Sequence, residues 1–191
     1  MSLNTTGSVR GQKTWDIING IDLMTELASW SLDMDDLIYG LKPNDGPRKK
    51  VYFAGPWFSS NDFAFMKWIE ETEQKLRPYS HYQVYFPRQH DGNSPKETFL
   101  QNVKGIDDAD IVLAWISTKD VGTSWEIGRA YTAGKQVILL GYDDTCFTTH
   151  ISLMIAYNGK CLTSKSFGEF LLNKLTNDDF ITVDNLWEGK E

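Results

Sequence analysis

The chain has 191 residues, of which 41% are hydrophobic and 24% charged, so a chain that is disordered throughout is excluded. Its formal net charge of −7 argues against a protein that grips a nucleic-acid backbone, because that binding needs clustered Lys and Arg. No apolar run approaches the roughly 18 residues of a membrane-spanning helix and no signal peptide opens the sequence, so we expect a cytoplasmic protein without a membrane partner.

The first 49 residues differ in pattern from the rest of the chain. Residues 1–13 are polar and rich in Gly, Ser and Thr, which predicts a flexible terminus. Apolar residues between Trp15 and Trp30 recur at helical spacing, and a second short amphipathic stretch follows Ser31. Residues 42–47 have the composition of a linker. We therefore expect a helical N-terminal extension at 1–49, packed on a core domain at 50–191.

From residue 50 onward, predicted strands and helices alternate. The expected strands are 50–55, 82–86, 111–116 and 136–141, and the expected helices are 61–76, 96–107 and 123–133. The run 111–116 is apolar throughout, as is typical of a central parallel strand buried on both faces. The alternation predicts an open, mostly parallel, twisted α/β sheet of the flavodoxin or Rossmann type, with helices on both faces.

In such sheets, ligands bind beyond the carboxyl ends of the strands, near the point where the strand order reverses. This rule selects the loops at 55–61, 88–93 and 117–125. In the last loop, Thr123 and Ser124 are candidate N-caps, and either would place Glu126 in the first turn of a helix. Its carboxylate could cap that helix, or the helix N-terminus could keep it ionised in a pocket as a nucleophile toward a sugar carbon.

Two of these loops carry further binding candidates. Asp120 could be a solvated turn residue, or it could accept a hydrogen bond from a ligand hydroxyl in the same pocket as Glu126. Trp57 and Phe58 could sandwich a planar base or belong to the core. The loop at Gly55 lacks the further glycines of phosphate-binding and dinucleotide-binding loops. The histidines lack metal-ligand spacing and the cysteines are too few for a four-thiolate zinc site, so we expect no metal or other cofactor.

Four motifs follow one another in a characteristic order. The first strand runs into a Gly-containing aromatic loop at 51–58, and the segment 102–106 precedes the apolar strand. An Asp-x-Gly-x-x-x-Glu-x-Gly pattern then spans 120–128, and a Leu-Met pair ends the triplet 152–154. Together these motifs resemble the nucleoside 2-deoxyribosyltransferase family over about residues 50–170.

The resemblance implies a function for the candidate residues. Glu126 would attack the anomeric carbon of a 2′-deoxynucleoside, and a second purine or pyrimidine base would then take up the sugar with retained configuration. Tyr52 would orient Glu126, and Asp120 would accept a hydrogen bond from the sugar 5′-hydroxyl. The other implied substrate-binding positions are Gly55, Trp57, Phe58, Gln89, Asn102, Gly122, Ser152 and Met154. Because residues 152–154 serve a neighbouring subunit in the family, a dimer-based homo-oligomer with shared sites is implied.

Two positions depart from the family pattern. Asn102 stands where the family often has an aspartate that contacts the base, and an amide cannot act as a general acid. Ser152 replaces the usual asparagine. An N-glycoside hydrolase of nucleosides or nucleotides, or a non-catalytic nucleotide-sensing module, are therefore alternatives on the same scaffold. The carboxylate of Asp120 would repel a 5′-phosphate, which favours a free nucleoside as the substrate.

Overall fold

We analysed a computed structural model of the chain, which describes residues 17–18, 21–57, 63–90, 92–116, 120–142, 146–147 and 153–182. Its centre is a five-stranded sheet in which every neighbouring pair of strands is parallel. The strands are β3 (Lys49–Ala54), β4 (Tyr82–Tyr85), β5 (Ile111–Trp115), β6 (Gln136–Gly141) and β7 (Lys160–Thr163). Their order, β4-β3-β5-β6-β7, is that of a flavodoxin-like doubly wound sheet. The predicted fold class is confirmed.

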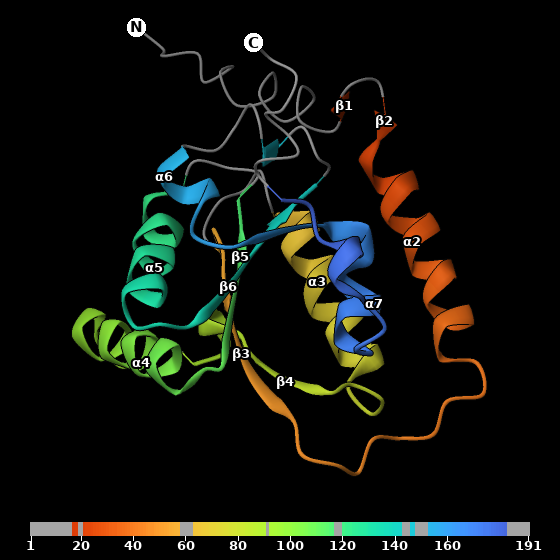
Figure 1. Cartoon of the computed structure of the whole chain (residues 1–191), viewed down its shortest axis with the longest axis horizontal. Helices are drawn as coiled ribbons and strands as arrows, with labels where there is room; N and C mark the ends of the chain where they lie inside the picture. Colours follow the sequence, from red (N-terminus) through yellow and green to blue (C-terminus); the bar gives the residue numbers. More distant parts are fainter. Residues whose placement is uncertain are drawn as a thin grey trace, which may run out of the picture.

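Helices cover both faces of this sheet (Figure 1). On one face lie α3 (Phe63–Leu76) and α7 (Phe167–Leu171), and on the other lie α4 (Pro95–Asp108) and α5 (Val121–Thr132). The short helices η1 (Pro87–His90), α6 (Leu153–Ala156), η3 (Ser164–Ser166) and η4 (Asn177–Asp179) connect or follow these elements. None of the helices in the described part of the chain is long and apolar enough to cross a membrane.

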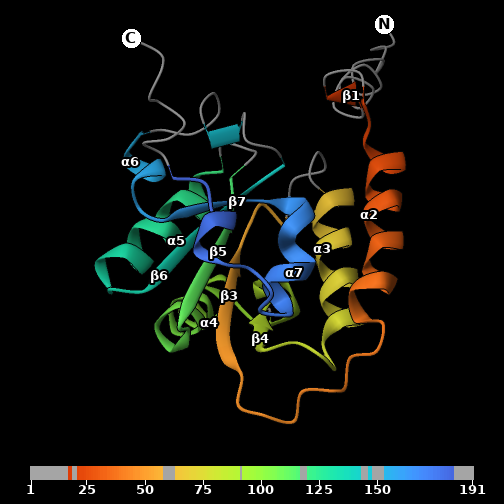
Figure 2. The same ribbon diagram turned by 45° about the vertical axis from the view of Figure 1, so that its right-hand side comes forward.

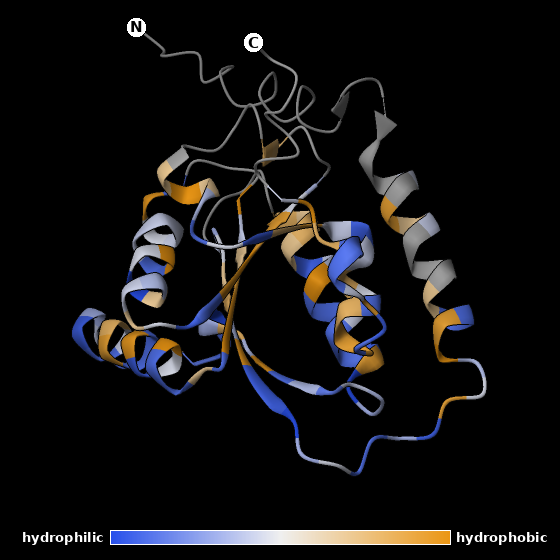
Figure 3. Ribbon diagram, viewed as in Figure 1, coloured by the Kyte–Doolittle hydropathy of each residue, from blue (hydrophilic) through white to orange (hydrophobic). Residues whose placement is uncertain are grey.

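The core lies between the central strands and the helices. Every residue of β5 is buried, as the apolar run predicted, and β3 changes from two exposed lysines to four buried residues. Figure 3 shows the same change, because the start of β3 is hydrophilic and its remainder hydrophobic. Helix α3 buries Phe65, Trp68 and Ile69 on one face. The fifth strand, β7, was not among the predicted strands.

The N-terminal extension differs from its prediction. Instead of a helix starting near Trp15, β1 (Ile17–Ile18) and β2 (Ile21–Asp22) pair as antiparallel strands, and a single helix, α2 (Leu23–Ile38), continues through Ser31. The sequence between the two strands is Asn-Gly, the dipeptide that most favours a two-residue hairpin over a helix. The helical spacing used for the first stretch therefore gave the wrong secondary structure for its beginning.

Helix α2 packs on the side of the molecule formed by α3 and α7 (Figure 2). Leu27 and Met34 of α2 are buried, and Asp35 forms a 2.6 Å ion pair with Lys75 of α3. After α7, Lys174 donates a 2.8 Å hydrogen bond to the carbonyl oxygen of Leu37. Helix α2 thus covers the outer surface of α3 and α7, away from α4 and α5 (Figure 1).

Candidate active site

The strand order reverses between β3 and β5, because the chain passes from β3 outward to β4 and then returns to the other side of β3. Loops that follow β3, β4 and β5 meet beyond the carboxyl ends of these strands, around a cavity of about 470 Å³. The residues that line it are Gly55, Pro56, Trp57, Pro87, Arg88, Thr98, Asn102, Asp120, Gly122, Thr123 and Glu126. The cavity lies where the loop rule placed it.

The N-cap of α5 differs from the prediction and changes the position of Glu126 in the helix. Asp120 is the cap, and its Oδ2 accepts hydrogen bonds from the backbone N of Thr123 at 2.6 Å and from the Thr123 hydroxyl at 2.8 Å. Thr123 and Ser124, the predicted caps, are already helical residues. Because α5 begins at Val121, Glu126 belongs to the second turn and not to the first.

The side chain of Tyr52 connects β3 to α5. Its hydroxyl donates a 2.6 Å hydrogen bond to Oε1 of Glu126, across 74 positions of sequence. Side chains alternate between the two faces of a strand, so Tyr52 points to the α4 and α5 side whereas Phe53 packs against Phe167 of α7 on the other. Tyr52 is fully buried, which holds its hydroxyl in one place beside the carboxylate.

The surroundings of Glu126 favour its neutral form. The pKa of Glu126 is raised from 4.5 to about 7: burial raises it most, the hydrogen bond from Tyr52 lowers it, and the nearby charge of Asp120 raises it. The placement of Glu126 in the first turn was wrong. In the second turn the dipole effect fades, and desolvation is the largest influence on the pKa of this carboxyl. Burial, followed by the charge of Glu126, raises the pKa of Tyr52 far above its usual range, so Tyr52 remains a proton donor.

Asp120 is the cap of α5 and also lines the cavity, and so it is not a solvated turn residue. Among the described residues, its two hydrogen bonds as a helix cap use Oδ2, which leaves Oδ1 for a ligand at the cavity wall. Gly122 lies directly above this carboxylate, because a Cβ at that position would come within 3.1 Å of Oδ2. A cap that also lines a cavity is held in place by the helix that it begins.

Two buried polar atoms at the cavity lack a hydrogen-bond partner within the described residues: Nε1 of Trp57 and Oδ1 of Asn102. Such groups cost about 1–3 kcal/mol each when they stay unsatisfied, so both are suited to bind polar atoms of a ligand. The Trp57 ring makes edge contacts with Phe53 and Phe86, at centroid distances of 5.7 and 5.5 Å. Trp57 is therefore a core residue that also lines the cavity.

Of the other substrate-binding positions that the resemblance implies, only some line the cavity. Gly55 lines the cavity, but Gln89 does not, and its side chain donates a 3.3 Å hydrogen bond to Glu70. Met154 is 81% exposed and is not among the lining residues. Phe58 and Ser152 lie outside the described residues.

Arg88 lines the cavity but was not singled out from the sequence. It forms a 3.4 Å ion pair with Glu70. Its position directly after the Pro that follows β4 was the available signal. In the described part of the chain, no group of three His, Cys, Asp or Glu side chains could hold a metal ion.

Comparison with known proteins agrees with this geometry. The model of the nucleoside 2-deoxyribosyltransferase family matches residues 51–187. A 2-deoxyribosyltransferase from Bacillus psychrosaccharolyticus superimposes with a TM-score of 0.52 at 23% identity, over 70% of this chain and 97% of that one. A conserved protein from Enterococcus faecalis superimposes with a TM-score of 0.51 at 24% identity, over 67% and 99%. These two structures support the fold.

No curated protein sequence matches the chain. The family match, however, extends over more than half of the chain and includes every described residue that lines the cavity. The chain therefore belongs to the nucleoside 2-deoxyribosyltransferase family.

Proposed function

We propose that this protein transfers the 2-deoxyribosyl group of a 2′-deoxynucleoside to another free purine or pyrimidine base, through a covalent intermediate on Glu126. One observation carries the proposal. The 2.6 Å pair of Tyr52 and Glu126 stands at the cavity formed by the loops after β3, β4 and β5, in a chain of this family. A carboxylate that is partly withdrawn from water and held by one hydrogen bond is suited to attack a sugar carbon.

The proposed reaction has two displacements at C1′ of the sugar. Tyr52 holds Oε1 of Glu126, so Oε2 forms the bond to C1′ while the bond from C1′ to the base nitrogen breaks. The electron pair of the broken bond leaves with the first base, which takes up a proton from solvent. A ring nitrogen of the second base then bonds to C1′ and releases its proton, and the electron pair of the C1′–Oε2 bond returns to the carboxylate. Two inversions retain the configuration.

The remaining cavity groups are assigned to binding. Oδ1 of Asp120 would accept a hydrogen bond from the 5′-hydroxyl, while its Oδ2 stays on the helix cap. The unsatisfied Asn102 and Trp57 atoms would hydrogen-bond the base. Because an amide does not donate a proton to a leaving group, Asn102 would orient the base and not protonate it. Deoxynucleosides and free bases are thus the proposed small-molecule partners.

A second copy of the chain is the proposed macromolecular partner. Met154 is exposed and does not line the cavity of its own chain, which supports a role at a neighbouring site. Phe99 of α4 and Trp125 of α5 are both about half exposed and lie in contact, at a centroid distance of 5.7 Å. Large exposed aromatic residues in mutual contact favour burial against a partner. Light scattering that finds only an active monomer would contradict this proposal.

One observation favours a different acceptor or substrate. Arg88 lines the same cavity as Asp120 and places a cation where a phosphate-bearing substrate could use it. Hydrolysis of a nucleoside or nucleotide N-glycosidic bond, with water as the second nucleophile, is therefore the alternative. The ion pair of Arg88 with Glu70 reduces the charge available to a phosphate, and this favours the nucleoside.

Chromatography of thymidine or deoxyinosine incubated with adenine distinguishes these functions. A new deoxynucleoside is the result expected for transfer, whereas free base without a new deoxynucleoside indicates hydrolysis. No change with any substrate would indicate a sensing module and would contradict both enzymatic functions. Glu126→Gln is the matched control, because the amide is nearly isosteric but a poor nucleophile. Mass spectrometry of the protein mixed with thymidine alone should detect a deoxyribosyl adduct that Glu126→Gln lacks.

A further inference from the structure

A glycine of α4 lies in contact with two aromatic rings behind the candidate nucleophile. A Cβ placed on Gly105 would lie 2.9 Å from Cδ2 and 3.0 Å from Cε2 of Tyr52, and 3.1 Å from Cε1 of Tyr85. Carbon atoms in contact are normally about 3.5–4.0 Å apart. Helix α4 can therefore approach both rings only because residue 105 has no side chain.

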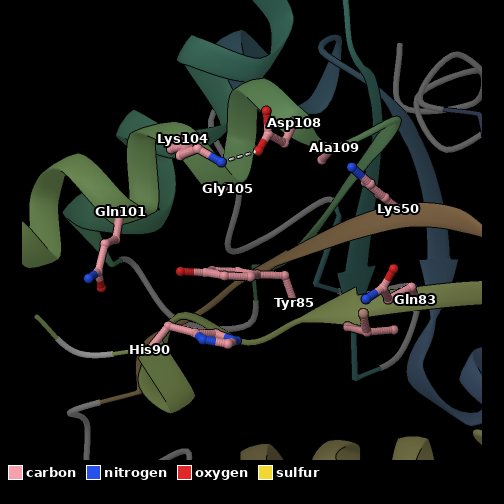
Figure 4. A pocket seen from close by; sticks show the side chains of 10 residues that line it. Lys50, Gln83, Tyr85, His90, Gln101, Lys104, Gly105, Asp108 and Ala109 are labelled. Atoms are coloured by element: carbon pink, nitrogen blue, oxygen red, sulfur yellow. Dashed lines mark hydrogen bonds and ion pairs between the residues drawn. The ribbon is translucent and has the colours of Figure 1, made fainter.

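The two rings that meet Gly105 belong to one stack. Tyr52 and Tyr85 have centroids 5.6 Å apart and an interplanar angle of 17°, and Tyr85 stacks in turn on His90 at 4.3 Å and 9°. Figure 4 shows the Tyr85 and His90 rings lying nearly parallel, with Gly105 on the helix beside them. Both tyrosines point to the α4 side of neighbouring parallel strands, where they are register partners.

The two tyrosines differ in their freedom to move. Tyr85 is partly buried on the edge strand β4, and it borders a second cavity of about 520 Å³ together with His90 and Lys104 (Figure 4). Tyr52 is fully buried on β3, between β4 and β5, and its hydroxyl is bound to Glu126. A side chain at position 105 could push Tyr85 into the cavity, but it could move Tyr52 only at the expense of the hydrogen bond.

We propose that Gly105 is a positioning residue: it admits the Tyr52 ring against the backbone of α4, with Tyr85 stacked behind it, and so fixes the Tyr52 hydroxyl on Glu126. The inference rests on the proposed function, because the bond that it protects is the one that orients the nucleophile. A methyl group at this position displaces the Tyr52 hydroxyl from Oε1. Small displacements of this kind in an active site lower the rate by up to about a hundredfold.

The displacement has a readout that a loss of stability alone would not change. Among the described residues, the ionisable groups that share the surroundings of Glu126 are Tyr52, Asp120 and Arg88, and the hydrogen bond from Tyr52 lowers the pKa of Glu126. Weakening that bond raises the pKa, so the acid limb of the rate profile moves to higher pH. On the far side of the stack, His90 and Lys104 face Tyr85 and not the carboxylate.

The test is a titration of the Glu126 side chain by NMR in the full-length protein labelled with ¹³C at glutamate carboxyls, with its signal assigned from Glu126→Gln. Gly105→Ala is expected to raise the pKa of Glu126 and to lower kcat by about tenfold to a hundredfold, with KM little changed. Tyr52→Phe should raise the same pKa, and Gly105→Ala should add nothing further in the Tyr52→Phe background.

Two controls separate positioning from general damage. Gly128→Ala is the same exchange in α5, at a position where an added Cβ meets nothing within 4 Å, so it should leave the titration unchanged. Ile106→Val loosens the packing of the same helix without entering the contact, because Ile106 is buried beside Gly105. If Gly105→Ala does not fold, Tyr85→Leu removes the ring that supports Tyr52 and should raise the pKa of Glu126 in the same direction.

The outcomes are distinguishable from those of the proposed function. An unchanged pKa of Glu126 in Gly105→Ala, or in Tyr85→Leu where the alanine variant fails to fold, would overturn the inference. Equal effects of Gly105→Ala and Ile106→Val, or full additivity with Tyr52→Phe, would also overturn it. If the wild-type protein exchanges no bases, the proposed function fails, whereas the titration still decides whether Gly105 positions Tyr52.

Discussion

Replacing the candidate nucleophile should stabilise the protein while it removes activity. A carboxyl whose pKa rises from 4.5 in the unfolded chain to about 7 in the folded one binds its proton more tightly when folded. Folding then becomes less favourable as the pH rises between these two values. At about 1.36 kcal/mol for each pH unit, the ionised carboxylate lowers the free energy of unfolding by about 3 kcal/mol above pH 7. Glu126→Gln removes this cost, because a neutral amide can still accept the bond from Tyr52.

Urea denaturation of the wild type and of Glu126→Gln at pH 8 and at pH 4.5 measures the effect. At pH 8 we expect the variant to be more stable by up to about 3 kcal/mol, or about 6–12 °C in Tm. This value is an upper bound, because the buried amide also loses some hydration on folding. At pH 4.5 the difference should shrink to about 0.4 kcal/mol, because Glu126 is then neutral in the folded wild type and about half protonated in the unfolded chain. Glu71→Gln is the control, since Glu71 is 61% exposed and should give little change at either pH. A stability gain that is absent at pH 8, or equal at both pH values, would refute the reasoning.

Three further predictions concern the same cavity. The wild-type exchange rate should fall about tenfold between pH 8 and pH 6, because ionised Glu126 is required and its pKa is about 7; a rate profile flat to pH 5 would contradict this. Asp120→Ala should cost about 0.5–2 kcal/mol of stability because it removes the cap of α5, whereas Asp120→Asn keeps the cap, and paired denaturation measurements check this difference. Both variants remove the charge beside Glu126, so both should lower its pKa and move the acid limb of the rate profile to lower pH. Thymidine should exceed its 5′-monophosphate in kcat/KM by at least about a hundredfold, through the lost hydrogen bond to Asp120 and like-charge repulsion; competition assays that show the reverse preference would favour nucleotide hydrolysis with Arg88 as the phosphate partner.

Much of the sheet could be predicted from sequence because its central strands are strongly patterned. The run Ile111–Trp115 is apolar at every position. In a chain in which strands and helices alternate, such a run is typical of a parallel strand buried on both faces. The four residues Lys160–Thr163 are too short and too mixed to give that signal, so β7 emerges only from its pairing with β6. The Asn19-Gly20 dipeptide is a hairpin signal, whereas the prediction for this stretch followed only the helical spacing of its apolar residues.

The start of α5 could not be predicted from N-cap preferences alone. Asp120, Thr123 and Ser124 are all good N-cap residues, and the sequence does not rank them. The choice depends on where the chain leaves β5, and the carboxylate of Asp120 reaches Thr123 N from there. The shift of the cap from Thr123 to Asp120 moves Glu126 into the second turn. Burial, and not the helix dipole, is then the largest influence on the pKa of Glu126.

The family resemblance implied that Tyr52 orients Glu126, but it could not reveal how the surroundings of this pair change the pKa of Glu126. Their 2.6 Å bond depends on the register of β3 beside β5, on the pitch of α5, and on the absence of a side chain at Gly105. Each of these is a property of elements far apart in the chain. The same burial that positions the carboxylate of Glu126 raises its pKa to about 7, so the carboxylate is not fully ionised at neutral pH. The Tyr52 hydrogen bond opposes that rise. A glycine in a third element, α4, is therefore expected to influence how much of the Glu126 carboxylate is ionised.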